Sequence, residues 1–184
     1  ENLLMDLLFL WRLEIEVGVE ALKPVDIAAL LSELSDELST THPDRQVEVE
    51  VSTDHIVQGD YRELYSAVSN LVLNAMKYSP DDSPVQISWR RRGSRYYLAI
   101  SDQGIGVEAS HIPRLTERFY RVEDSRNSAS GGTGLGLAIV KHVAAAHGAQ
   151  LRIESEVGKG STFSLEFPDR GELHDSRKTG GPAA

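Results

Sequence analysis

The sequence contains no cysteine among its 184 residues. Disulfide bonds and cysteine-based metal sites are therefore excluded, and the composition suits a reducing compartment. Basic residues are also scarce, with 19 Lys and Arg against 28 Asp and Glu and a formal net charge of −9. Broad contact with nucleic acid needs a basic face, so this charge balance argues against a nucleic-acid-binding protein.

Long hydrophobic runs are missing as well. The apolar run Leu7–Trp11 is far shorter than the ~20 residues needed to cross a bilayer, and Asp6 and Arg12 flank it. No signal peptide and no internal repeat is evident. The first residue is Glu rather than Met, which predicts a fragment or a processed form. The length is sufficient for one good core, or for a core with an appendage.

Residues 2–22 have the apolar spacing of an amphipathic helix, carried by Leu3, Leu4, Leu7, Leu8, Trp11 and Ile15. One helix cannot bury such a face by itself. It therefore either docks on the rest of the domain or pairs with another chain, and the near-heptad spacing is compatible with both.

The rest of the chain alternates between helical and extended patterns. Helical periodicity predicts helices near 27–40, 61–78 and 134–147. Alternation, β-branched residues and turn signals predict strands near 47–51, 56–57, 85–90, 96–101, 151–156 and 161–167.

The helix predicted for 61–78 carries an unusual polar face. At ~100° per residue, Asn70, Asn74, Lys77 and Tyr78 fall on one side, next to an apolar stripe. Asn is a poor residue for a helix interior because its amide competes for backbone hydrogen bonds. Two of them one turn apart indicate either a solvated face or a ligand site.

Two glycine-rich segments follow. The segment Asp102–Gly106 comes directly after a predicted strand, and it places a carboxylate beside a backbone that a ligand can approach closely. The segment Gly132–Leu137 opens a predicted helix, where bare N–H groups and the helix dipole favour phosphate. It has no Walker lysine and does not follow a strand, so it is neither a P-loop nor a dinucleotide motif.

These motifs, together with Phe119-Tyr120-Arg121 between them, resemble in their order the ATP-binding catalytic domain of sensor histidine kinases, within the GHKL superfamily. The resemblance covers about residues 26–168. It implies the Bergerat fold, an α+β two-layer sandwich in which a mixed sheet is covered on one face by three helices. Residues 1–22 would be the end of the second helix of a dimerisation and phosphotransfer domain, 23–168 the ATP-binding domain, and 169–184 a disordered tail.

The resemblance also assigns roles by position. Asn70 and Asn74 would bind Mg²⁺ and the phosphate region, because amide oxygens suit a hard cation. Lys77 would contact phosphate, and Tyr78 would lie near the adenine. Asp102 would accept a hydrogen bond from the adenine amino group.

The glycine-rich segments complete the implied ATP site. Gly104 and Gly106 would let the base and a lid close in, and residues 121–133 would be that lid. Arg121 would steady the γ-phosphate, with Asn70 the second catalytic residue. The remaining residues of the implied site are Tyr120, Gly132, Thr133, Gly134, Leu135, Gly136 and Leu137.

Two departures from relatives are informative, the first from hydrolytic GHKL enzymes and the second from complete histidine kinases. Asn70 stands where those enzymes have the Glu that activates water, and an amide cannot take a proton, so transfer to a protein acceptor is favoured. The six histidines are His42, His55, His111, His142, His147 and His174. None has the surroundings of a phosphoacceptor, so the acceptor His is expected to lie outside this chain, and His111, His142 and His147 are expected to be ordinary surface or core residues.

Within the family, residues 111–122 and Ile139–His142 resemble most the sensor kinases of the phosphate regulon. The implied partners are the phosphotransfer domain of the same kinase, a second copy in a homodimer, and a PhoB-like response regulator. The chain would be the cytoplasmic domain of a bacterial inner-membrane sensor. Two alternatives remain open: another GHKL kinase such as an anti-sigma-factor Ser kinase, and a nucleotide-regulated docking module.

Overall fold

The computed structural model describes residues 3–15, 22–122 and 132–169 of the chain, and a five-stranded sheet is its central element. The strands lie in the order β2-β4-β5-β7-β6. Their bounds are β2 (Val47–Val51), β4 (Val85–Arg92), β5 (Arg95–Asp102), β7 (Gly160–Pro168) and β6 (Gln150–Glu156). Strand β2 runs parallel to β4, while the other neighbouring strands are antiparallel, so the predicted mixed sheet is confirmed.

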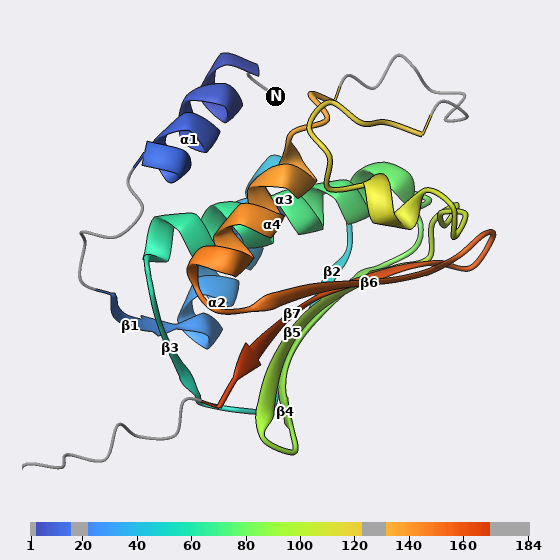
Figure 1. Cartoon of the computed structure of the whole chain (residues 1–184). Helices are drawn as coiled ribbons and strands as arrows, with labels where there is room; N and C mark the ends of the chain where they lie inside the picture. The colour runs from blue at the N-terminus through green and yellow to red at the C-terminus, as the bar shows by residue number, and fades with distance from the viewer. Residues whose placement is uncertain (1–2, 16–21, 123–131, 170–184) are drawn as a thin grey trace, which may run out of the picture.

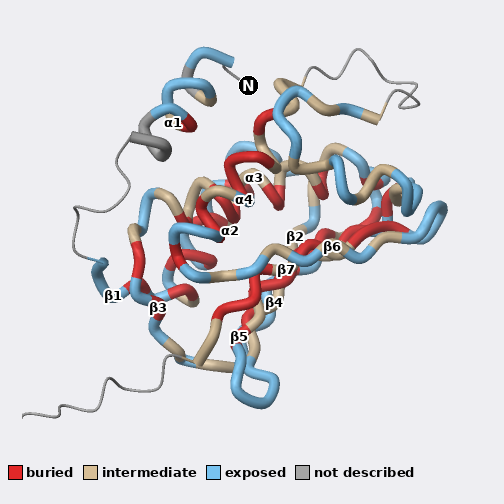
Figure 2. The backbone as a smooth tube through the Cα atoms, viewed as in Figure 1, coloured by how far each residue is buried: buried red, intermediate tan, exposed pale blue. Residues whose placement is uncertain are grey.

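Three helices cover one face of this sheet, as the sequence predicted (Figure 1). They are α2 (Ile27–Thr41), α3 (Tyr61–Tyr78) and α4 (Gly136–Ala146). A short 3₁₀ helix, η1 (Ile112–Arg114), lies in the segment that joins β5 to α4. The buried part of the backbone is concentrated where the helices and the sheet face each other (Figure 2). The architecture is therefore a two-layer sandwich with one core between its layers.

Two aspartates determine where the first two of these helices begin. The Asp26 carboxylate accepts a hydrogen bond from the backbone N–H of Ala29 at 3.1 Å, at the start of α2. Asp60 does the same for Glu63 at 3.0 Å, at the start of α3. Each cap satisfies one of the donors that a helix N-terminus leaves free.

The core follows from the apolar stripes of the helices and the alternation in the strands. On α2 the buried residues recur with helical spacing, and on β4 and β5 every second side chain points into the core. Trp89 of β4 is fully buried, and its ring contacts Phe167 of β7 edge-on at a centroid separation of 5.9 Å. The largest fully buried side chains besides Trp89 are Ile27, Leu30, Leu31, Leu34, Leu64, Leu71, Ile87, Leu98, Ile100, Leu135 and Ile139.

The strand predicted near 56–57 does not join the main sheet. It forms β3 (Ile56–Gly59), which pairs antiparallel with β1 (Lys23–Asp26) in a separate two-stranded sheet. Strand β1 was not predicted from the sequence, and it contains Pro24. Proline is tolerated at the edge of a sheet, where no partner needs its missing N–H. Alternation predicts a strand, but the choice of its partner is made by the tertiary fold.

The N-terminal helix α1 (Leu3–Ile15) uses part of its apolar face to dock on the domain, which is one of the two expected uses. Leu10 is buried in the core cluster and Phe9 packs against that cluster, so the helix docks on the domain. Its other large apolar side chains in the described part remain exposed: Leu3, Leu4, Leu7, Leu8 and Trp11. Residues 16–21, which the prediction included in this helix, lie outside the described residues. Among the described residues, no helix is long and apolar enough to cross a membrane.

We predict that Leu34→Ala destabilises the fold strongly. Leu34 is 1% exposed on α2, so its truncation leaves a cavity, and the free energy of unfolding should fall by about 2–5 kcal/mol. Urea denaturation measures this change. The matched control is Ser32→Ala at an exposed position of the same helix, which should change it by less than about 0.5 kcal/mol. Equal stability of the two variants would show that the core is not packed as described.

Candidate nucleotide-binding site

A cavity of about 340 Å³ opens between the C-terminal half of α3, the loop after β5 and the start of α4. This volume lies in the range of small-molecule sites. Its walls also include the segment 111–122 and the β6–β7 hairpin. The cavity therefore gathers five parts of the chain that are distant in sequence.

The polar face of α3 supplies one wall. Asn74, Lys77 and Tyr78, which their helical spacing placed on one face, all line the cavity. The Lys77 ammonium lies 5.3 Å from the centroid of the Tyr78 ring. This wall therefore offers an amide, a cation and an aromatic ring within two turns of one helix.

Asn70 belongs to the same face but does not line the cavity directly. Its side-chain N–H donates to the backbone carbonyl of Ser66 at 2.8 Å, which leaves its oxygen as the available atom. That oxygen lies against Gly136, where a Cβ atom would be only 2.7 Å from it. Gly136 itself lines the cavity, so the Asn70 oxygen lies immediately behind the glycine-rich wall.

Asp102, at the end of β5, provides a buried carboxylate in the cavity wall. Its residue is 9% exposed, and burial raises the pKa of this carboxyl above its ordinary value. The backbone N–H groups of Gly104 and Ser161 donate to it and partly offset the rise in pKa. The Gly104 bond measures 2.8 Å. A carboxylate has about four acceptor positions, so this one retains acceptor capacity toward the cavity.

The loop after Asp102 is pressed against the end of α3. The Tyr78 carbonyl accepts a hydrogen bond from the Ile105 N–H at 3.3 Å. A Cβ atom on Gly104 would come within 2.3 Å of the same carbonyl oxygen, so only glycine permits this approach. The two walls that carry Tyr78 and Asp102 are thus joined directly through the backbone.

The segment 111–122 forms the opposite wall. The Tyr120 hydroxyl and the His111 Nδ1 atom are 2.5 Å apart, and the Arg114 guanidinium lies 4.1 Å from the centroid of the Tyr120 ring. Phe119 adopts a φ of 63°, which is rare for a non-glycine residue, and its N–H donates to the Gly134 carbonyl at 2.9 Å. These contacts hold Tyr120 and Arg121 at the cavity.

The second glycine-rich segment closes the cavity at the start of α4. Gly132, Thr133, Gly134, Gly136 and Leu137 line it, whereas Leu135 is fully buried in the core. The Thr133 hydroxyl donates to the Asp6 carboxylate of α1 at 2.9 Å, which links the N-terminal helix to this wall. Of the lid expected at 121–133, residues 123–131 lie outside the described residues.

Most of the residues proposed from the sequence therefore meet at one cavity. The exceptions are Asn70, Gly104 and Leu135, which lie just behind its surface. Sequence reasoning missed the lining residues Ile105, Val107, Glu108, His111, Leu115, Val122, Val157, Ser161 and Phe163. Ile105 and Val107 flank a recognised glycine and could have been included. His111 was expected to be an ordinary surface or core residue. Neither its sequence neighbours nor those of the β6–β7 residues indicate that these side chains line a cavity.

The side chains at the cavity determine which metal ion could bind there. In the part of the chain that the structure describes, no three His, Cys, Asp or Glu side chains are grouped to hold one. The side-chain oxygens of Asn70 and Asn74 are candidate ligands for such an ion, together with the phosphate oxygens of a nucleotide. Mg²⁺ commonly binds in this way, keeping water and phosphate ligands.

Comparison with known proteins agrees with this geometry. Residues 59–171 match the family described as histidine kinase-, DNA gyrase B- and HSP90-like ATPase. The phosphate regulon sensor protein PhoR of Pseudomonas aeruginosa is 47% identical over 169 residues, covering 91% of this chain and 38% of that protein. The sensor-like histidine kinase SenX3 of Mycolicibacterium smegmatis is 40% identical over 182 residues, covering 96% and 47%. The chain thus spans less than half the length of these relatives.

Solved structures give the same result. The mycobacterial sensor histidine kinase MprB is 31% identical with a TM-score of 0.70, covering 80% of this chain and 97% of that chain. Full-length ShkA in complex with AMPPNP is 29% identical with a TM-score of 0.76, covering 90% and 35%. With a family match over more than half of its length, the chain belongs to the histidine kinase-, DNA gyrase B- and HSP90-like ATPases, in the branch of the two-component sensor histidine kinases.

Proposed function

We propose that this chain binds Mg-ATP in the cavity and donates the γ-phosphate to a histidine outside this chain, for relay to an aspartate of a response regulator. Membership in an ATPase family implies ATP as the ligand. The observation that carries the proposal is the convergence of one buried carboxylate, one polar helix face and one glycine-rich helix start on a single cavity.

The base would bind at the Asp102 end. An ionised carboxylate in a buried wall is a strong acceptor for the exocyclic amino group of adenine. Tyr78 lines the same region and offers an aromatic face, and Gly106 in the cavity wall would let the loop backbone approach the base. A guanine base presents an oxygen where adenine has the amino group, so Asp102 would select adenine.

The phosphates would bind between α3 and the start of α4. Lys77 and Arg121 supply positive charge, and the glycine-rich segment supplies N–H groups at a helix start. Asn74 reaches the cavity directly. The Asn70 oxygen, left available by the hydrogen bond to Ser66, would join it as a ligand of Mg²⁺.

The residues of this site suit phosphoryl transfer rather than hydrolysis. In the transfer, the bond between the γ-phosphorus and the bridging oxygen of ADP breaks, and a bond from phosphorus to an imidazole nitrogen forms. Asn70 cannot accept a proton from water, so it positions charge and does not activate a nucleophile. The imidazole proton would pass to a base beside the acceptor histidine.

The partners follow from the proposed reaction. They are the phosphotransfer domain that carries the histidine, a second kinase copy, and a response regulator. PhoR is one of the similar proteins, so we propose phosphate-starvation signalling with a PhoB-like regulator. In this proposal residues 1–22 end a phosphotransfer helix, 23–168 form the ATP-binding domain and 169–184 form a tail, all on the cytoplasmic side of a membrane-bound sensor.

We predict that Asp102→Asn weakens ATP binding without weakening the fold. Loss of a charge-assisted hydrogen bond should cost about 1.5–3 kcal/mol, or roughly ten- to a hundredfold in affinity. Because burial disfavours the ionised carboxyl, its replacement should not lower the free energy of unfolding. Calorimetric titration with Mg-ATP measures the first effect and urea denaturation the second. Asp44→Asn, an exposed matched control, should change neither, and equal affinity of Asp102→Asn and the wild type would exclude the adenine contact.

We further predict that the chain by itself incorporates no acid-labile phosphate from radiolabelled ATP. Addition of a separately purified phosphotransfer domain of PhoR should yield acid-labile label on that domain, and Asp102→Asn should reduce its rate. Label on serine that survives acid would instead favour a Ser kinase. Acid-labile label on this chain alone would mean that one of its own histidines is an acceptor.

A further inference from the structure

The C-terminal end of α3 needs external hydrogen-bond donors, because the last four carbonyls of a helix have no partner within it. The Ala75 carbonyl is satisfied locally, by the N–H of Ser79 at 3.1 Å and its hydroxyl at 2.6 Å. The next carbonyls belong to the turn that carries Lys77 and Tyr78, two residues of the cavity wall. How this turn is held therefore bears directly on the site.

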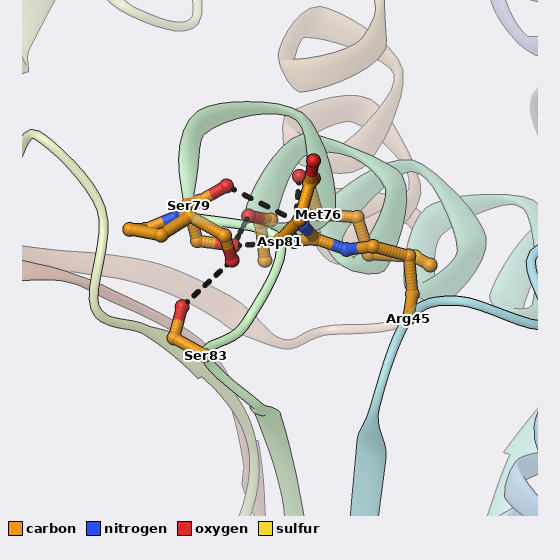
Figure 3. Close-up of polar contacts among 7 residues, drawn as sticks. Arg45, Met76, Ser79, Asp81 and Ser83 are labelled. Atoms are coloured by element: carbon orange, nitrogen blue, oxygen red, sulfur yellow. Dashed lines mark hydrogen bonds and ion pairs between the residues drawn. The ribbon is translucent and has the colours of Figure 1, made fainter.

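Arg45, from the loop between α2 and β2, supplies one of these donors and also bonds to the residues that follow the helix (Figure 3). Its Nη2 atom donates to the Met76 carbonyl at 2.8 Å and to the Ser79 hydroxyl at 2.7 Å. Its Nη1 atom donates to the Asp81 carboxylate at 2.5 Å and to the Ser79 carbonyl at 3.5 Å. One guanidinium thus spans the end of α3 and the turn that follows it.

The contacts with the end of α3 matter more than the ion pair. The Arg45 side chain is 8% exposed, whereas the Asp81 side chain is 96% exposed. A carboxylate in water contributes little, because solvent screens it. The buried guanidinium is instead held by a helix C-terminus, where the dipole favours a positive charge. Lysine could not make these contacts together, since it lacks the planar fork.

The same turn is also bonded to the adenine side of the cavity. The Tyr78 carbonyl accepts the Ile105 N–H and lies against Gly104, whose own N–H donates to Asp102. A shift of the end of α3 would therefore move the Asp102 loop, because Gly104 and the Tyr78 carbonyl are already in close contact. The path from the buried guanidinium to the buried carboxylate is short. It runs from Arg45 to the Met76 carbonyl, along the last turn of α3 to the Tyr78 carbonyl, and through Gly104 to Asp102.

We propose that Arg45 is a positioning residue for the nucleotide site: it fixes the last turn of α3 and, through the Tyr78 carbonyl, sets where Asp102 lies relative to Lys77 and Tyr78. Arg45 does not line the cavity and touches no ligand in this proposal. The effect of Arg45 on ATP affinity rests on the proposed function, whereas its effect on the position of the Asp102 loop does not.

The test compares Arg45→Gln and Arg45→Lys with two controls. Asp81→Asn removes only the exposed carboxylate, and Leu34→Ala lowers stability without touching the cavity. Mg-ATP affinity is measured by calorimetry at a temperature at which circular dichroism shows every variant to be folded. Amide NMR shifts of Gly104 and Ile105 are recorded without nucleotide, with Gly93 in the β4–β5 turn as the internal reference.

We expect Arg45→Gln to weaken Mg-ATP binding about tenfold, and Arg45→Lys to restore part of that loss. Both controls should bind within about twofold of the wild type, since neither changes the α3 turn. The Gly104 and Ile105 amides should shift in Arg45→Gln, while Gly93 should not. This pattern separates positioning from stability, because Leu34→Ala is destabilised and yet keeps its affinity.

The proposal is overturned if Arg45→Gln is destabilised but binds Mg-ATP like the wild type and leaves the Gly104 and Ile105 amides in place. Should Arg45→Gln fail to fold, the same comparison with Arg45→Lys decides. If the wild type itself does not bind Mg-ATP, the proposed function fails, and the amide shifts of the nucleotide-free variants still decide the role of Arg45.

Discussion

The burial of one carboxylate is the interaction on which the candidate site depends. Asp102 is at the end of β5, where desolvation raises its pKa and two backbone N–H groups partly compensate. A desolvated carboxylate needs hydrogen-bond donors in fixed positions, because a misplaced donor would leave its charge without a partner in the cavity wall. The tight contact of Gly104 with the Tyr78 carbonyl provides that environment.

Helix α3 serves both the core and the site. Its apolar stripe packs into the core, so its rotation is fixed, and its polar face is consequently fixed toward the cavity. The Asp60 cap sets where the helix begins, and Arg45 satisfies carbonyls where it ends. The helix is thus held at both ends. Its cavity-lining residues therefore keep fixed positions relative to the glycine-rich wall.

The family relationship and the chemistry agree at Asn70. The family resemblance places Asn70 where hydrolytic relatives have a water-activating Glu, and this chain has an amide there. The hydrogen bond to Ser66 turns the amide nitrogen away, and the close approach of Gly136 leaves no room for a side chain in front of the oxygen. The amide oxygen therefore faces the start of α4, which is consistent with the proposed role of Asn70 as a ligand of Mg²⁺.

The sequence by itself determined the helices, most strands and the polar face of α3, because each depends on neighbours within a few residues. Helical spacing and the two glycine-rich segments also indicated the parts of α3, the Asp102–Gly106 loop and the Gly132–Leu137 segment that line the cavity, while Tyr120 and Arg121 came only from the family resemblance. Only the tertiary structure decided that β3 leaves the main sheet for β1, that the β6–β7 hairpin and His111 reach the cavity, and that Arg45 ends α3. Those contacts join segments that are distant in sequence. Such contacts could not be predicted, because neither segment carries a local sequence pattern that identifies the other.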